Sequence, residues 1–193
     1  MHHRGYTMKT KKLNPTTMAT IAVMTAVMCI FGPMSVPIGP VPISLTVFTV
    51  FLSVCILGAW KGTLAYIVYL LIGLTGIPVL SNYTGGPEKL FGPTGGYLIG
   101  FIPMALISGF FIDRFRKIIG LQVTGMLLGL AVCYAFGTAW LAVMAGMTFS
   151  AALKAGVLPF VPFDLIKIAV SVVIGRAVRT RLTPVLHLQQ KNA

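Results

Sequence analysis

The chain contains the stretch PFVPFDLIKIAVSVVIGR at residues 159–176, whose only charges before the final arginine are Asp164 and Lys167. A run of this length is able to cross a membrane as a helix, since a bilayer core needs about 20 apolar residues. Asp164 and Lys167 are three positions apart, so on a helix their side chains share one face. An ionisable residue inside a membrane span is costly and usually faces a partner, a cavity or a ligand. The stretch therefore predicts a membrane helix that carries a binding site.

The composition of the whole chain agrees with this interpretation. Of the 193 residues, 56% are hydrophobic and only 9% are charged, whereas soluble domains carry about 25% charged residues. We therefore expect an integral membrane protein that lies in a lipid bilayer. The net charge of +12 does not point to nucleic acid, because the basic residues lie between apolar runs, where they orient a protein in the membrane.

Apolar runs predict an all-α protein with six transmembrane helices. The expected spans are Thr16–Val36, Ile43–Ala59, Gly62–Leu80, Thr94–Ile112, Ile119–Gly146 and Pro159–Val178. Stretches rich in glycine and proline separate several of them, and such stretches favour ordered loops over helix. The sequence thus divides into an N-terminal tail (residues 1–15), a membrane domain (16–179) and a C-terminal tail (180–193).

The distribution of lysine and arginine predicts the orientation. With the N-terminus placed in the cytoplasm, twelve basic residues lie on the inner side and only Lys89 and Lys154 on the outer side. Such an excess on the cytoplasmic side is typical of membrane proteins. An even number of spans with both termini in the cytoplasm therefore fits the charges. The inner residues are Arg4, Lys9, Lys11, Lys12, Lys61, Arg114, Arg116, Lys117, Arg176, Arg179, Arg181 and Lys191.

The sequence lacks the motifs of a catalytic or metal centre. It has no GxxxxGK[ST] phosphate-binding loop, no HExxH and no GxSxG, and it contains three acidic residues in total. Two of these are outside the quoted stretch, and Asp113, beside Arg114 in the inner turn, is expected to have a surface role. We therefore expect neither an enzyme nor a metal site nor a bound cofactor, and the function indicated is ligand capture.

A ligand site is expected at the outer end of the last span. Three outer connections converge there (residues 33–42, 81–93 and 147–158), and they place Asp164 and Lys167 one to two turns below the surface. Lysine suits a carboxylate or a carbonyl oxygen, aspartate accepts from N–H groups, and Asn82 is able to do both. The alternative is an Asp164–Lys167 ion pair that only neutralises itself between packed helices. Nearby aromatic residues offer apolar walls: Tyr83, Phe91, Tyr97, Phe160 and Phe163.

Small residues recur at helical spacing in several spans. Ala19, Ala22 and Ala26 form a stripe on the first span, and glycine pairs four positions apart occur at Gly58–Gly62, Gly92–Gly96, Gly96–Gly100 and Gly125–Gly129. Such spacing lets helices approach closely. For the glycine pairs we expect packing within this chain.

Four motifs carry a resemblance to a known family. They are VPIS at residues 41–44, GIPV at 76–79, FGPTGGYLIGF at 91–101 and AGVLPFVPFDLIKI at 155–168. In this order, across residues 16–179, they resemble the BioY family. These proteins are the biotin-specific S components, or substrate-binding subunits, of energy-coupling-factor (ECF) transporters.

The resemblance implies a function and a set of partners. It implies a multi-pass protein of the bacterial inner membrane that binds biotin near its outer face. The implied partners are a transmembrane coupling subunit and two cytoplasmic ATPases, which supply ATP hydrolysis. Asn82, Tyr97, Asp164 and Lys167 become the expected biotin-binding residues, and the alanines of the first span the expected contacts with the coupling subunit. An S component for a different vitamin and a structural subunit with an internal ion pair remain the alternatives.

Overall fold

A computed structural model describes residues 15–37 and 41–190, with side chains through residue 182. The tail before residue 15, with four of the inner basic residues, lies outside the described residues, as does Lys191. The elements are α1 (Pro15–Phe31), β1 (Ser35–Val36), β2 (Ile43–Ser44), α2 (Thr46–Leu57), α3 (Ala59–Leu74), α4 (Pro87–Phe91), α5 (Gly95–Arg114), α6 (Ile119–Ala145), α7 (Phe149–Gly156) and α8 (Val161–Gln190).

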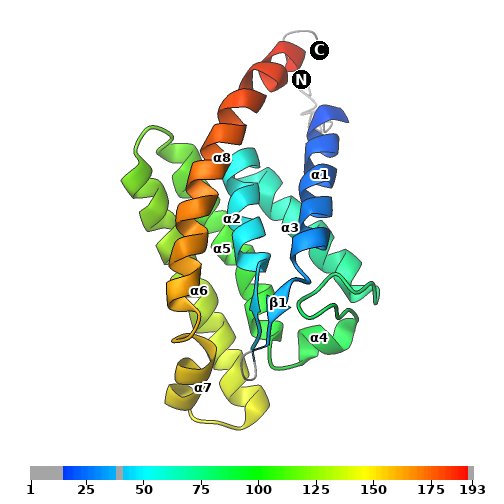
Figure 1. Cartoon of the computed structure of the whole chain (residues 1–193), viewed down its shortest axis with the longest axis vertical. Helices are drawn as coiled ribbons and strands as arrows, with labels where there is room; N and C mark the ends of the chain where they lie inside the picture. The colour runs from blue at the N-terminus through cyan, green and yellow to red at the C-terminus, as the bar shows by residue number, and fades with distance from the viewer. Residues whose placement is uncertain (1–14, 38–40, 191–193) are drawn as a thin grey trace, which may run out of the picture.

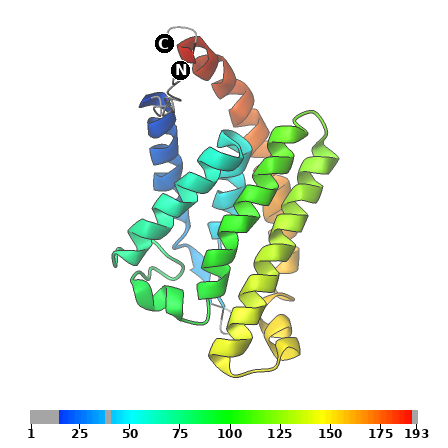
Figure 2. The same cartoon turned by 180° about the vertical axis from the view of Figure 1, so that it is seen from behind.

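Long helices run along the molecule and short elements gather at one end. Figure 1 shows α1, α2, α3, α5, α6 and α8 lengthwise, with β1, α4 and α7 together at the lower end. The view from behind shows α5 and α6 side by side along their length (Figure 2). The three connections predicted to converge therefore lie at one end of the bundle, as expected.

The predicted apolar helices are present, and their lengths differ. Among the described residues, α5 with 20 residues and α6 with 27 are each long and apolar enough to cross a membrane. The pair α7 and α8, bent by 50° at their junction, passes the same test together. The apolar helices α1, α2 and α3 have 17, 12 and 16 residues. The protein is thus mostly helical and membrane-like.

The first three predicted spans were too long, and a small hairpin of two two-residue strands interrupts the otherwise helical chain. The expected span Thr16–Val36 ends in β1 and the span Ile43–Ala59 begins in β2, where Ser35 pairs with Ser44 and Val36 with Ile43 in an antiparallel hairpin. Prolines at positions 33 and 42 oppose helix here. The span Gly62–Leu80 is helical only to Leu74, because Gly76 takes a φ of +97° and a proline follows two residues later.

The end of the chain also differs from the predicted boundaries. Within the connection at residues 147–158, a helix that was not predicted, α7, begins where the Thr148 hydroxyl accepts a hydrogen bond from the Ala151 N–H at 3.4 Å. A threonine at this position stabilises a helix start. Helix α8 begins at Val161 and continues to Gln190, well past the predicted end at Val178.

Glycines on α5 and α6 form the contact between these helices. A side chain at Gly96 would meet Trp140 and the Phe136 carbonyl, and one at Gly129 would meet the Met104 carbonyl at 2.7 Å. The remaining approaches follow the same pattern, with Gly100 against Cys133 and Gly125 against Phe111. The prediction that these glycine pairs pack within the chain is confirmed.

Asp113 has a side chain that is 36% exposed, and it has a structural role in addition to the surface role that was expected. One carboxylate oxygen accepts a hydrogen bond from the Ala59 N–H at 2.8 Å, at the start of α3. The other lies 2.8 Å from the Arg179 guanidinium of α8, and Arg116 approaches it to 4.0 Å. A carboxylate at a helix N-terminus satisfies a free N–H and interacts favourably with the helix dipole. Asp113 therefore joins α3, α5 and α8.

Candidate binding site

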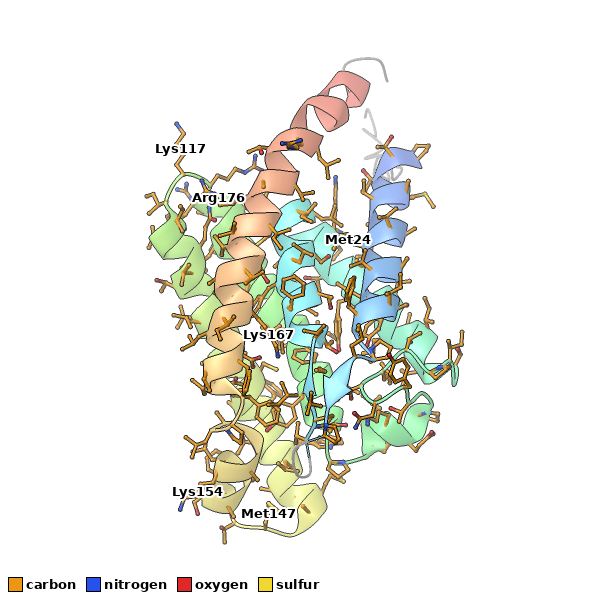
Figure 3. All side chains as sticks on the ribbon, viewed as in Figure 1. Met24, Lys117, Met147, Lys154, Lys167 and Arg176 are labelled. Carbon is orange, nitrogen blue, oxygen red and sulfur yellow. The ribbon has the colours of Figure 1, made fainter. Side chains whose placement is uncertain are left out.

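The site is centred on the Asp164–Lys167 pair in the first turns of α8. The Lys167 Nζ lies 2.8 Å from Asp164 Oδ1, and the two side chains are 11% and 2% exposed. Figure 3 shows Lys167 between α8 and α2, inside the bundle. The three-residue spacing brought the two charges together as predicted. A pair this deeply buried needs further hydrogen bonds to offset the loss of water around both charges.

Two other segments provide those hydrogen bonds. The Tyr134 hydroxyl of α6 donates to Asp164 Oδ2 at 2.6 Å. Lys167 Nζ donates to the Ser44 carbonyl at 2.7 Å, where β2 leads into α2. Both aspartate oxygens therefore have partners, and Lys167 uses two of its three N–H donors on described groups. The third donor of Lys167 is available to a carbonyl or carboxylate of a ligand.

A cavity of about 50 Å³ lies beside these side chains. Its lining combines these polar groups with apolar residues, among them Phe101, Phe160 and Val47. Tyr97 also lines the cavity, and its hydroxyl donates to the Gly156 carbonyl at 2.9 Å. Few polar groups in an apolar pocket are typical of small-molecule sites. The remaining lining residues are Val41, Pro42, Ser44, Thr46, Ser81, Thr94, Leu98, Cys133, Tyr134 and Gly156.

Asn82 lies outside this cavity, in contrast to Tyr97. It is exposed, with a φ of +62°, and its Oδ1 accepts a hydrogen bond from the Ser35 hydroxyl at 2.6 Å. It lines a second cavity of about 260 Å³ near α4. The two cavities share Pro42 and Thr94 as walls. The structure thus brings Tyr97, Asp164 and Lys167 into one cavity and places Asn82 in its neighbour.

The predicted aromatic walls are correct in part. Phe160 and Tyr97 line the central cavity and are 6% and 7% exposed. Tyr83, Phe91 and Phe163 were wrong, since each is at least half exposed and none lines either cavity. Nearness in sequence was a poor guide, because Tyr83 lies in a turn, Phe91 ends α4, and Phe163 is on an exposed face of α8.

Tyr134 and the Ser44 carbonyl were not found from the sequence. Tyr134 stands 30 residues before its partner Asp164, and no local pattern joins them. One signal was available, because a tyrosine in an apolar helix usually finds a hydrogen-bond partner for its hydroxyl. A backbone carbonyl offers no such signal.

The Tyr134→Phe variant is expected to bind the ligand of this site about tenfold less tightly. It removes a hydrogen bond to a charged group, a kind of bond that contributes about 1.5–3 kcal/mol. Calorimetric titration of purified protein measures the change, and Tyr83→Phe, at an exposed tyrosine, is the matched control. An unchanged affinity would mean that Tyr134 only fills space.

The alanine stripe of α1 is exposed at Ala19, Ala22 and Ala26. Ala22 and Ala26 flank a shallow, mostly apolar groove of about 540 Å³, which α1 forms with Leu64, Val68 and Ile72 of α3. The stripe therefore faces outward and does not pack inside this chain. Among the described residues, no group of three acidic, histidine or cysteine side chains is placed to hold a metal ion.

Comparison with known proteins places the chain among transport proteins. Biotin transporter BioY of Thermotoga maritima is 41% identical over 79% of this chain and 89% of its own length. The probable biotin transporter BioY of Pyrococcus horikoshii is 38% identical over 80% and 91%. The crystal structure of the S component for biotin from an ECF-type ABC transporter superposes with a TM-score of 0.80 at 31% identity, covering 86% of this chain and 91% of that one. The BioY family model matches residues 7–184, and the chain therefore belongs to the BioY family.

Proposed function

We propose that this protein is the biotin-binding S component of an ECF-type transporter. The observation that carries the proposal is the buried Asp164–Lys167 pair, which faces a cavity with one lysine donor to spare. Relatives across the family are named biotin transporters. The site has hydrogen-bonding groups, an apolar wall and no nucleophile–base set, so its chemistry is capture and release.

The chemistry of biotin matches the available groups. Its ureido ring presents two N–H donors and a carbonyl, its side chain ends in a carboxylate, and the rest is apolar. Asp164 accepts from N–H groups, Lys167 donates to a carbonyl or carboxylate, and Asn82 does both. With Tyr97 and Phe160 against the apolar part, each kind of biotin group has a counterpart at the site.

Binding of a two-ring ligand requires the two cavities to join. The central cavity measures about 50 Å³, whereas an apolar cavity of about 150 Å³ is what holds benzene. Pro42 and Thr94 stand between this space and the cavity of about 260 Å³ beside Asn82. Movement of these walls would bring Asn82 within reach of the same ligand as Asp164 and Lys167.

The proposed arrangement in the membrane has six spans with both termini in the cytoplasm of a bacterial cell. The short helices α1, α2 and α3, the long helices α5 and α6, and the bent pair α7 and α8 would be the spans. The site end of the bundle then faces outward. The excess of lysine and arginine toward the other end supports this orientation.

Transport would depend on partner subunits, because the sequence has no phosphate-binding loop. A transmembrane coupling subunit and two cytoplasmic ATPases would supply the energy. The exposed stripe of Ala19, Ala22 and Ala26 beside the groove between α1 and α3 is the proposed contact with the coupling subunit, since small residues allow close helix approach.

The Ala22→Leu/Ala26→Leu variant is expected to lose the coupling subunit while its biotin affinity stays unchanged. The added side chains would hold the partner helix away from the stripe. Co-purification in mild detergent measures assembly, and Val23→Leu, at an exposed position on the same helix, is the control. Assembly at the level of the parent protein would place the contact elsewhere.

The proposed function is tested by titrating purified protein with biotin in a calorimeter, with thiamin and riboflavin as competitors. We expect saturable binding of biotin that neither competitor displaces. Displacement by another vitamin would identify that vitamin as the substrate. The absence of saturable binding by folded protein would contradict the proposal.

A further inference from the structure

A second cavity lies at the end of the bundle opposite the Asp164–Lys167 site. It measures about 190 Å³ and is formed where α2, α5 and α8 meet the turn between α5 and α6. Cys55 and Ile112 provide its apolar part. The polar part consists of Arg116, Gln122, Arg176, Arg179 and Thr180.

Three guanidinium groups line this cavity, and a single nearby carboxylate neutralises only part of their positive charge. Asp113 lies 2.8 Å from Arg179 and 4.0 Å from Arg116. Its second oxygen is taken by the Ala59 N–H at the start of α3. The chain has only three acidic residues, and the other two are Glu88 and Asp164. The cavity therefore carries a surplus of positive charge.

Two of the arginines have weak partners in the described structure. Arg176 Nη1 lies 3.5 Å from Gln122 Oε1, and the Arg116 side chain is 66% exposed. Gln122 itself is buried, and its amide donates to the Phe115 and Arg116 carbonyls at 2.9 and 3.0 Å, which fixes the turn. Figure 3 shows Arg176 reaching from α8 toward this turn, whereas Lys117 points away from the bundle. Arg116 and Arg176 thus line one cavity and have N–H donors left for a ligand.

We propose that this cavity binds an anionic phosphate group, as found in the headgroup of an acidic phospholipid. Arginine binds phosphate oxygens through paired hydrogen bonds. Basic pockets between membrane helices suit acidic headgroups. The Cys55 and Ile112 side suits the start of an acyl chain, and inorganic phosphate shares the headgroup chemistry.

The test compares lipids by native mass spectrometry of the full chain in detergent. Phosphatidylglycerol and phosphatidylcholine with the same acyl chains are added to the parent protein and to Arg116→Gln/Arg176→Gln. We expect the parent to prefer phosphatidylglycerol, and the variant to lose about tenfold of that preference. Circular dichroism and gel filtration verify that each protein is folded, and Arg116→Gln alone, at an exposed arginine, replaces the double variant if that one fails to fold.

Lys117→Gln/Arg181→Gln is the matched control, because it removes two positive charges from exposed residues at the same end. It is expected to keep the preference within about threefold. Equal losses in both double variants would overturn the site in favour of diffuse electrostatic attraction. No loss in either variant would also overturn the site, because these charges would then not contribute to lipid binding. Displacement of the lipid by millimolar sodium phosphate supports the site with free phosphate as its ligand, and no displacement supports the lipid.

Discussion

Lys167→Ala is expected to lower the affinity for biotin by at least about tenfold. The Asp164 carboxylate, whose side chain is 2% exposed, would lose the ammonium that now lies 2.8 Å away. Removal of one partner of a buried pair costs about 3–5 kcal/mol. Asp164→Asn, which leaves Lys167 without a negatively charged partner, is expected to have an effect of the same order. Calorimetric titration of each purified variant with biotin measures the loss.

Lys154→Ala is the control for this pair of variants. Lys154 is an exposed lysine on α7 at the same end of the bundle, and Figure 3 shows it pointing outward. Its loss is expected to leave the affinity unchanged. Unchanged affinity in both Lys167→Ala and Asp164→Asn would move the site elsewhere. The Asp164→Asn/Lys167→Met variant tests the alternative that the ion pair only neutralises itself between packed helices. If that alternative were correct, the variant would fold as well as the parent, and its response to biotin would equal that of the parent.

Gly129→Ala is expected to destabilise the protein by about 1–3 kcal/mol, the usual effect of overpacking a tight contact. The added carbon would lie 2.7 Å from the Met104 carbonyl and 2.5 Å from the Ser108 hydroxyl, so α5 and α6 would have to separate. Alanine otherwise favours helix over glycine by about 1 kcal/mol. The steric effect therefore opposes the propensity, and thermal unfolding in detergent shows which is larger.

Gly120→Ala provides the matched control on the same helix. Nothing lies within 4 Å of a side chain at this exposed position. The variant is expected to unfold at the same temperature as the parent or slightly above it. If Gly129→Ala behaved in the same way, the contact between α5 and α6 would be looser than the structure shows.

Signals local in sequence predicted most of the fold and the centre of the site. Long apolar runs predicted α5 and α6 almost to the residue, because membrane helices need continuous apolar sequence. The three-residue spacing predicted the Asp164–Lys167 contact. Contacts distant in sequence were not predicted: Tyr134 meets Asp164 only because α6 and α8 lie side by side, and the hairpin of β1 and β2 depends on how residues 35–36 meet residues 43–44.

The role of Asp113 shows why position in a sequence is a weak guide to the contacts that a residue makes at a turn. Its neighbours Arg114, Arg116 and Lys117 are typical of a solvated loop, and the sequence predicted a surface residue. Its actual partners come from α3 and α8, 54 and 66 residues away. Asn82, which is expected to contact the same ligand as Asp164, lines the neighbouring cavity, where its backbone and side chain are held by Pro33 and Ser35.

Helix α8 is held to its neighbours at two points. Near its start, Lys167 and Asp164 hydrogen-bond to Ser44 and Tyr134, and further along Arg179 pairs with Asp113 of α5. Fifteen residues separate Asp164 from Arg179, which corresponds to about 22 Å along a helix axis, and on roughly the same side. A helix attached to its neighbours at two points on one side resists sliding, because movement along its axis would strain both sets of contacts. A tilt of α8 about the side that carries these contacts would leave both sets in place. Any movement of α8 that accompanies transport is therefore expected to be a tilt rather than a shift along the helix axis.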